Sequence, residues 1–356
     1  DDKCYVYASI PATPGYEDSK VLGFISHMDT VSDFADHMVQ PIVHENYDGK
    51  DLPLGESGRT LEVSLFPHLP SLKGRTLITS DGTTILGADD KAGVAAIMCM
   101  AERLMKDDMP HGKICIGFTP DEEVGGGADH FDVKGFGADF AYTVDGGAES
   151  EIEYENFNAV RADVDFKGFN IHPGSAKNTM INAALVAMEF NNMLPAGETP
   201  RDTDGYEGFY HLTRMSGNVE KANLNYILRD HDADNIARRQ EIMKEIAKKL
   251  NEKYGAGTVN LTLKEEYRNM AEKIRENFHL IENAKKAVKK SGVEPQVVPV
   301  RGGTDGARLS FMGLPCPNLG TGSYACHGPY EHATAEGMDI VVDTLTELVR
   351  LYGEMK

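Results

Sequence analysis

Histidine and carboxylate side chains follow short apolar runs in four separate parts of the sequence. A single acidic residue at the end of a strand is usually a helix cap or a turn former. Carboxylates that converge without a cation, however, would repel one another and raise their own pKa values. The repetition of the pattern therefore predicts a site that holds metal ions. The residues concerned are His27 and Asp29, Asp89 and Asp90, Glu122 and Glu123, and Asp145.

The triplet His27-Met28-Asp29 has the spacing of an extended strand end, where alternate residues point to the same side. A carboxylate beside a histidine can orient the ring and raise its basicity toward a metal. We therefore interpret His27 as a ligand and Asp29 as the acid that supports it. On its own this triplet is a weak signal.

The adjacent acids Glu122 and Glu123 lie between Pro120 and three consecutive glycines. An acidic pair of this kind can simply complement the dipole of a helix N-terminus. The functional interpretation separates the pair, with one glutamate ligating a metal and the other moving a proton. Spacing does not decide which glutamate has which role, nor whether Asp89 or Asp90 is the ligand.

The elements that must position these side chains have an α/β pattern. Apolar runs at 22–26, 113–118 and 140–145 predict buried strands, and an apolar stripe that starts near Lys91 predicts a helix that ends at Met109-Pro110. In an open α/β sheet, ligands bind beyond the carboxyl ends of the strands. This fold would deliver the acidic and imidazole groups to one edge of the sheet.

The pattern changes near residue 156 and changes back near residue 270. We predict a catalytic domain of 1–156 and 270–356, with a mixed sheet flanked by helices. An inserted α+β domain of 157–269 would carry an antiparallel sheet. The segments that support this division are a strand at 159–168, helices at 180–194 and 233–254, a polar loop at 195–208, a strand at 296–300 and a closing helix at 340–352.

Composition limits the partners and the compartment. The sequence has 36 basic and 56 acidic residues, a formal net charge of −20, which repels nucleic acid and anionic lipid. No apolar run approaches the ~18 residues of a membrane span, and the opening residues lack an export signal. The five cysteines are scattered without a CxxC pair, which favours a reducing cytoplasm over a disulfide framework.

A series of motifs runs through nearly the whole chain. They are GFISHMDT, LGADDKAG, FTPDEEVGGGADHFD, AYTVDGG, IHPGSAKNTMINA, YEGFYHL, RGGTDGARLSFMGLPCPNLGTG and CHGPYEHAT. In type and order they resemble the M20 family of di-zinc metallopeptidases, and within it the aminotripeptidases. Any one motif would be a weak match, whereas the ordered set is specific. Family members carry a further N-terminal segment before the strand that leads to His27, and this sequence opens at what resembles the following strand.

The resemblance implies which residues hold the metals. Asp89 would bridge two zinc ions, for which cobalt or manganese could substitute. Glu122 would be the catalytic carboxylate that acts as general base and acid, with Asp29 as the acid behind His27. The implied metal ligands are His27, Asp89, Glu123, Asp145 and His327.

The resemblance also implies residues that bind the substrate. His172 would meet the substrate near the scissile carbonyl, and Arg229 would recognise a substrate carboxylate. Asn182 and Arg301 are weaker candidates for substrate binding. If the inserted domain is a lid, it must close to bring His172 and Arg229 to the metals.

The activity that the resemblance implies is release of the N-terminal residue of tripeptides through a metal-bridged water, in the cytoplasm. The partners would be short peptides with free termini, and a homodimer could form through the inserted domain. Another M20-type amidohydrolase, such as a dipeptidase or an N-acyl amino acid hydrolase, would share the metal ligands and stays open. A catalytically silent peptide-binding module is a third interpretation, although it would be expected to lack Glu122.

Overall fold

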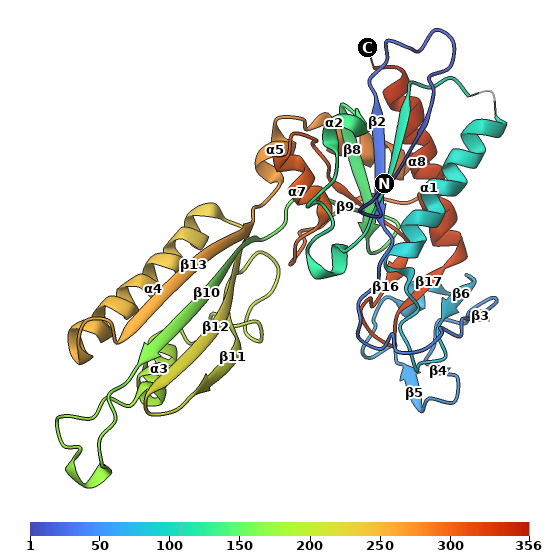
Figure 1. Ribbon diagram of the computed structural model, residues 1–356. Helices are drawn as coiled ribbons and strands as arrows, with labels where there is room; N and C mark the ends of the chain where they lie inside the picture. Colours follow the sequence, from blue (N-terminus) through green and yellow to red (C-terminus); the bar gives the residue numbers. More distant parts are fainter. Residues whose placement is uncertain (108, 356) are drawn as a thin grey trace. The chain divides into compact units, whose positions relative to one another are not determined.

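The computed structural model describes residues 1–107 and 109–355, and the chain divides into two compact units (Figure 1). The second unit includes a short segment, 299–303, that the division predicted from the sequence had assigned to the catalytic domain. Unit 1 consists of Asp1–Tyr154, Met270–Val298 and Thr304–Lys356, and unit 2 consists of Glu155–Asn269 and Pro299–Gly303.

A mixed seven-stranded sheet forms the centre of unit 1, in the order β1-β7-β2-β8-β15-β9-β14 (Figure 1). Strands β7, β2, β8 and β15 are parallel to one another, whereas β1 and β9 are antiparallel to β7 and β15. The predicted α/β class is confirmed. The bounds are β1 Val6–Ile10, β2 Leu22–His27, β7 Ile114–Thr119, β8 Phe140–Gly146, β9 Glu151–Glu153, β14 Gln296–Val297 and β15 Asn318–Gly320.

Both faces of this sheet are covered, because its central strands are apolar on both sides. Phe24 and Ile116 belong to a core with α1, α6 and α8, whereas the adjacent residues Ile25 and Cys115 belong to a second core with residues of α2 and α7. Helices α1 and α8 contact each other and lie side by side in Figure 1. The bounds are α1 Ala88–Lys106, α2 Val133–Phe136, α5 Ala271–Arg275, α6 His279–Lys290, α7 Asp305–Phe311 and α8 Ala335–Gly353.

A smaller part of unit 1 was not expected from the sequence. It consists of a four-stranded sheet, β16-β17-β6-β3, and a strand pair, β4-β5, with a separate core that includes Tyr47, Leu61 and Leu77. Strands of two or three residues are too short to show an alternating pattern. The bounds are β3 Ile42–His44, β4 Leu52–Leu54, β5 Arg59–Leu61, η1 Leu69–Leu72, β6 Leu77–Thr79, β16 Ser323–Tyr324 and β17 His332–Thr334.

Unit 2 is an antiparallel sheet, β11-β12-β10-β13, with α3 and α4 packed against it. Alternate residues of β12, such as Leu224, Tyr226 and Leu228, are buried beneath these helices. Helix α4 begins after Asp232, whose side chain caps it by accepting a hydrogen bond from the backbone of Asn235. The bounds are β10 Asn158–Lys167, η3 Pro173–Ser175, α3 Ala183–Asn192, β11 Phe209–Gly217, β12 Lys221–Asp230, α4 Ala233–Tyr254 and β13 Val259–Tyr267.

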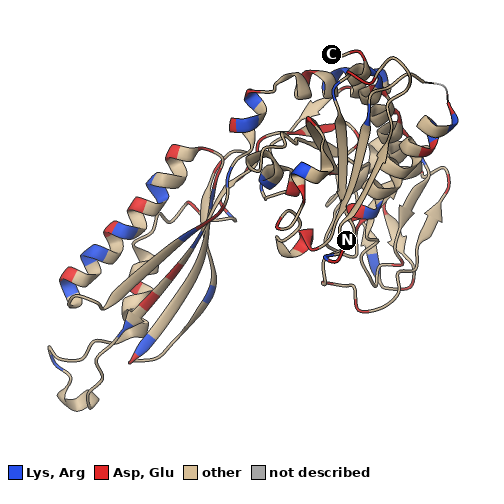
Figure 2. Cartoon of the chain, turned by 45° about the horizontal axis from the view of Figure 1, so that its top comes forward, with Lys and Arg blue, Asp and Glu red and all other residues tan. Residues whose placement is uncertain are grey.

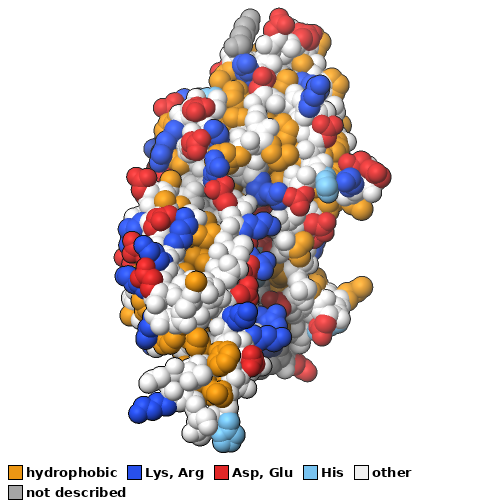
Figure 3. Space-filling view, turned by 60° about the vertical axis from the view of Figure 1, so that its left-hand side comes forward, with side chains coloured by type: hydrophobic (Ala, Val, Ile, Leu, Met, Phe, Trp, Pro, Cys, Tyr) orange, Lys and Arg blue, Asp and Glu red, His pale blue; other side chains and the backbone are white. Residues whose placement is uncertain are grey.

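Charged residues of both signs cover the surface. Helix α4 alternates basic and acidic residues along its length (Figure 2), and the face seen in Figure 3 has the two signs interspersed. That face therefore offers no broad basic area to a polyanion. Within 1–107 and 109–355, none of the helices combines the length and apolar character that crossing a membrane requires.

Candidate metal centre

The carboxyl ends of three neighbouring parallel strands meet at one edge of the unit 1 sheet. His27 is the last residue of β2 and pairs with Thr119 at the end of β7, while Asp145 lies near the end of the adjacent strand β8. The turn after β7 carries Glu122 and Glu123 in the 3-10 segment η2 (Glu122–Val124). The sheet thus brings together acidic and imidazole groups from distant parts of the sequence.

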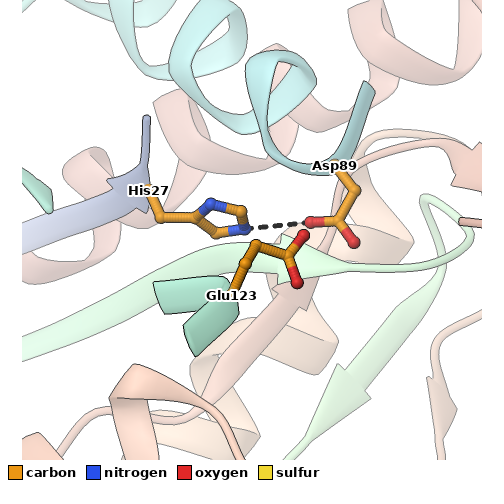
Figure 4. Close-up of side chains that lie close together, drawn as sticks. All are labelled: His27, Asp89 and Glu123. Atoms are coloured by element: carbon orange, nitrogen blue, oxygen red, sulfur yellow. Dashed lines mark hydrogen bonds and ion pairs between the residues drawn. The ribbon is translucent and has the colours of Figure 1, made fainter. Parts of the chain in front are cut away.

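Asp89, at the start of α1, lies between two histidines. Its Oδ1 is 2.9 Å from Nε2 of His27 (Figure 4), and its Oδ2 is 3.0 Å from Nε2 of His327. Nε2 of His27 is also 3.4 Å from Oδ1 of Asp145, and Nε2 of His327 is 3.2 Å from Oε2 of Glu123. The cluster of these five residues therefore consists of two histidine–carboxylate pairs that share Asp89.

The donor atoms of this cluster fit divalent metal ions. Those of His27, Asp89 and Glu123 lie within 4.8 Å of one another (Figure 4), and so do those of His27, Glu122 and Asp145. Mixed imidazole and carboxylate donors suit zinc, cobalt and manganese. Oε1 of Glu123 is buried and has no hydrogen-bond partner among the described residues, a deficit that a cation would remove.

The groups of the cluster shift one another's pKa values. Burial lowers the pKa of His27, but hydrogen bonds to Asp145 and Asp89 outweigh burial and raise this pKa far above its ordinary value. Hydrogen bonds to Asp89 and Glu123 raise the pKa of His327 to about 10. Without a metal, both imidazoles would hold a proton against the carboxylates. Metal binding should therefore release protons and weaken at low pH.

Glu122 lies in surroundings that disfavour its negative charge. Burial raises the pKa of Glu122 to about 9, and the charges of Asp145 and Asp305 add to this effect. Burial also raises the pKa of Asp305 to about 7. Asp305, which is not among the predicted site residues, begins α7 and accepts a 2.8 Å hydrogen bond from the hydroxyl of Thr119. A nearby cation would lower the pKa of Glu122 and leave it ionised at neutral pH.

Asp29 fixes the turn that carries the two glutamates. Its two carboxylate oxygens accept hydrogen bonds of 3.1 Å from the backbone N–H groups of Glu122 and Glu123. Nδ1 of His27 is 3.4 Å from Oδ1 of Asp29 but only 3.0 Å from the main-chain carbonyl oxygen of the same residue. In the neutral, metal-binding form of the ring, a proton on Nδ1 that is donated to this carbonyl would leave the lone pair of Nε2 for the metal.

Asp90 is fully buried, and its carboxylate is used within the protein. Its Oδ2 accepts hydrogen bonds from the hydroxyl of Ser26 and, at 3.1 Å, from the N–H of His27. Its Oδ1 accepts one of 3.3 Å from the N–H of Gly93. Of the two adjacent acids, Asp89 is therefore the one that faces both histidines.

Asp145 is held in place by Asn318 on β15. Oδ1 of Asn318 accepts a 3.1 Å hydrogen bond from the N–H of Asp145, and its Nδ2 donates a 2.6 Å bond to Oε2 of Glu153. Burial raises the pKa of Glu153 to about 8. Neither Asn318 nor Glu153 was predicted to have a role, because an acid or an amide in a strand of three residues gives no local signal.

Replacing Glu153 with Gln is expected to flatten the pH dependence of stability. The folded protein keeps a proton on Glu153 up to about pH 8, whereas the unfolded chain loses it near 4.5. Between these values the folded state binds more protons, so the free energy of unfolding falls as pH rises, by up to ~1.4 kcal/mol per pH unit. Urea titrations of both proteins between pH 5 and 8 would measure the two slopes. Equal slopes would contradict the effect assigned to Glu153.

Two of the residues predicted to bind substrate, His172 and Arg229, make hydrogen bonds within unit 2. Nδ1 of the exposed His172 accepts a 3.1 Å hydrogen bond from the N–H of Gly174, so the ring hydrogen of the neutral form lies on Nε2. Arg229 donates to Oε2 of Glu266 at 3.2 Å and to the carbonyl of Leu228 at 3.0 Å. Their role in binding stays a prediction.

Asn182 and Arg301 have structural roles in unit 2. Asn182 caps α3, because its Oδ1 accepts a 3.1 Å hydrogen bond from the N–H of Ala184. Arg301 donates hydrogen bonds of 2.7 and 3.0 Å to the carbonyl oxygens of Gly205 and Glu207, in the polar loop before β11. These contacts explain both residues without a substrate, and their predicted contribution to binding stays untested.

A family model described as peptidase family M20/M25/M40 matches residues 82–351. Peptidase T of Clostridium perfringens is 55% identical over 354 residues, which cover 99% of this chain and 87% of that relative. Two solved structures have a TM-score of 0.79 to this chain. Aminopeptidase PepT of Bacillus cereus is 23% identical, with 98% of this chain and 85% of that chain covered. A tripeptidase of Staphylococcus aureus is 22% identical, with 99% and 85% covered.

Proposed function

The chain belongs to peptidase family M20/M25/M40, and on this premise we propose that it is a metal-dependent aminopeptidase that releases the N-terminal residue of tripeptides. The 55% identity to a peptidase T over nearly the whole chain supports this activity. Unit 1 would be the catalytic domain, and unit 2 would contribute to recognition of the peptide.

The observation that carries the proposal is the shared carboxylate Asp89, with one oxygen 2.9 Å from His27 and the other 3.0 Å from His327. His27 and Asp145 would hold one ion, His327 and Glu123 the other, and Asp89 would bridge both. Two zinc ions, or cobalt or manganese in their place, would supply Lewis acidity and lower the pKa of a bound water.

Glu122 would move the proton during hydrolysis. Its carboxylate would take a proton from the attacking water and return it to the departing amine. The backbone hydrogen bonds from Glu122 and Glu123 to Asp29 support this role, because they keep the turn that carries the base at a fixed position. Asp29 would thus contribute to metal binding, by orienting the ring of His27, and to proton transfer, by holding the turn that carries Glu122.

His172 and Arg229 would recognise the substrate. Because Nδ1 of His172 is engaged by Gly174, its Nε2–H is available to stabilise the oxyanion formed at the scissile carbonyl. Arg229 would bind the C-terminal carboxylate of the peptide in place of its contact with Glu266. Recognition of that carboxylate would select short peptides by their length. Asn182 and Arg301 are weaker candidates for binding the same carboxylate. A cytoplasmic location and a homodimer through unit 2 stay predictions.

Comparison of four substrates tests the activity. Leu-Gly-Gly should be cleaved at the first bond, with Leu-Gly a poorer substrate and N-acetyl-leucine inert. Leu-Gly-Gly amide should have a kcat/KM ~10- to 100-fold below that of the free acid, because a charged hydrogen bond is typically worth ~1.5 to 3 kcal/mol. Product chromatography with added Zn²⁺ would measure these rates. Preference for the acylated substrate would instead indicate an N-acyl amino acid hydrolase.

A further inference from the structure

Glu331 is a buried acid without a role in the reaction described above. It is 1% exposed and follows His327 by four residues, in the turn before β17. Its Oε2 accepts a hydrogen bond of 2.6 Å from the N–H of Gly87, and its Oε1 accepts one of 2.9 Å from the N–H of Asp89. One carboxylate therefore holds the short turn that leads into α1.

Both ends of this contact belong to segments that carry cluster residues. The turn held by Glu331 carries Asp89, which faces His27 and His327 at once. The segment that supplies Glu331 also supplies His327. A single side chain thus ties together two ligand-bearing segments that lie far apart in the sequence. Loss of this acceptor would leave two backbone N–H groups without their partner, which is costly in a buried place.

We propose that Glu331 is a positioning residue that sets the direction of the Asp89 side chain and thereby controls the affinity for both metal ions. The inference rests on the proposed function, because it requires Asp89 as the shared ligand. Hydrogen bonds to a charged acceptor are stronger than those to a neutral one. Two such bonds from one carboxylate fix both the place and the rotation of the turn, and with them the two oxygens of Asp89.

Glu331→Gln is the sharpest test, because it preserves the size of the side chain and replaces one of the two accepting oxygens with a donor. The amide has a single oxygen, and its NH₂ group would face one of the two N–H donors. We expect E331Q to bind Zn²⁺ ~10- to 100-fold more weakly than the wild type at both sites, the usual cost of losing a partner behind a metal ligand. Competition titrations against a chelator of known affinity measure both dissociation constants. A direct ligand variant, E123Q, should instead weaken chiefly the ion held with His327.

Glu336→Gln is the matched control. Glu336 also accepts backbone hydrogen bonds with both oxygens, at 3.0 and 2.8 Å from the N–H of Thr76, but it holds no segment that carries a cluster residue. E336Q should therefore bind zinc as the wild type does. If Glu331 had only a structural role, E331Q would have a lower melting temperature with unchanged zinc affinity. That result would overturn the proposal.

The wild-type titration separates this inference from the proposed function. If the wild type binds no zinc, the proposed function fails and the inference fails with it. If the wild type binds two ions and E331Q binds them equally tightly, only the role of Glu331 fails. Should E331Q not fold, E331D takes its place with the same expectation, because its side chain is one methylene too short to reach both N–H groups.

Discussion

Replacing Glu122 with Gln is expected to lower kcat for Leu-Gly-Gly by ~10²- to 10⁴-fold, the usual contribution of general acid–base catalysis. Glutamine retains the shape of the side chain but cannot take up and return a proton. Burial raises the pKa of Glu122 to about 9, and cations held by the cluster would bring this pKa down toward the working pH. Steady-state kinetics on the zinc-saturated proteins would measure the loss.

The metal content of E122Q distinguishes a base from a ligand. The donor atoms of Glu122 lie within 4.8 Å of those of His27 and Asp145, so geometry alone would also permit Glu122 as a ligand. As a base, Glu122 can be lost without loss of zinc. A variant that loses an ion would make Glu122 a ligand, and a variant with unchanged kcat would remove it from the mechanism. E122D, which keeps a carboxylate on a shorter side chain, is the control and should retain part of the activity.

The meeting of His27 and Asp145 could be predicted from the sequence for a physical reason. The apolar runs of β2 and β8 are long enough to be recognised as buried strands, and both are followed by groups that can bind a metal. Parallel strands necessarily have their carboxyl ends at the same edge of the sheet. Element type and chain direction were therefore sufficient to expect these two side chains near each other.

The choice between adjacent acids could not be made from spacing. Asp89 and Asp90 both have backbone angles outside the helical region, with φ −82° and ψ 101° for the first and φ −121° and ψ 32° for the second. Neither helical nor strand periodicity therefore tells which of them faces the histidines. The same holds for Glu122 and Glu123. They follow Asp121, whose backbone has a left-handed conformation with φ 60°. In the sequence, only the family resemblance distinguished the metal ligand from its neighbour in each pair.

The groups behind the cluster were missed because their contacts are distant in sequence. Glu331 is separated by 242 residues from Asp89, and Asn318 by 173 residues from Asp145. A buried acceptor of this kind produces no periodic pattern. An acid in a turn is usually exposed to solvent or hydrogen-bonded to the backbone of the same turn. Its function depends on the packing of β15 and β17 against the rest of unit 1, which local residue types do not determine.

Replacing Asp89 with Ala is expected to remove both metal ions and with them the peptidase activity. Asp89 is the residue that offers one oxygen to each half of the cluster, so its loss deprives both ions of a ligand. Loss of a residue that only orients a metal ligand typically lowers metal affinity ~10- to 100-fold. Loss of a shared ligand should lower the affinity for each ion by more than this. Zinc analysis after dialysis against a weak chelator would measure the stoichiometry.

Comparison with Glu123→Ala makes the expectation for Asp89 specific. Glu123 lies 3.2 Å from His327, whereas His27 keeps Asp145 at 3.4 Å and Asp89 at 2.9 Å in its own half of the cluster. E123A should therefore retain one ion and D89A none. The rise in melting temperature on adding Zn²⁺ should be smaller in E123A than in the wild type and absent in D89A, because a ligand stabilises only the state that binds it. If D89A and E123A instead lost the same single ion, Asp89 would not be a shared ligand, and the two-ion mechanism would lose its central residue.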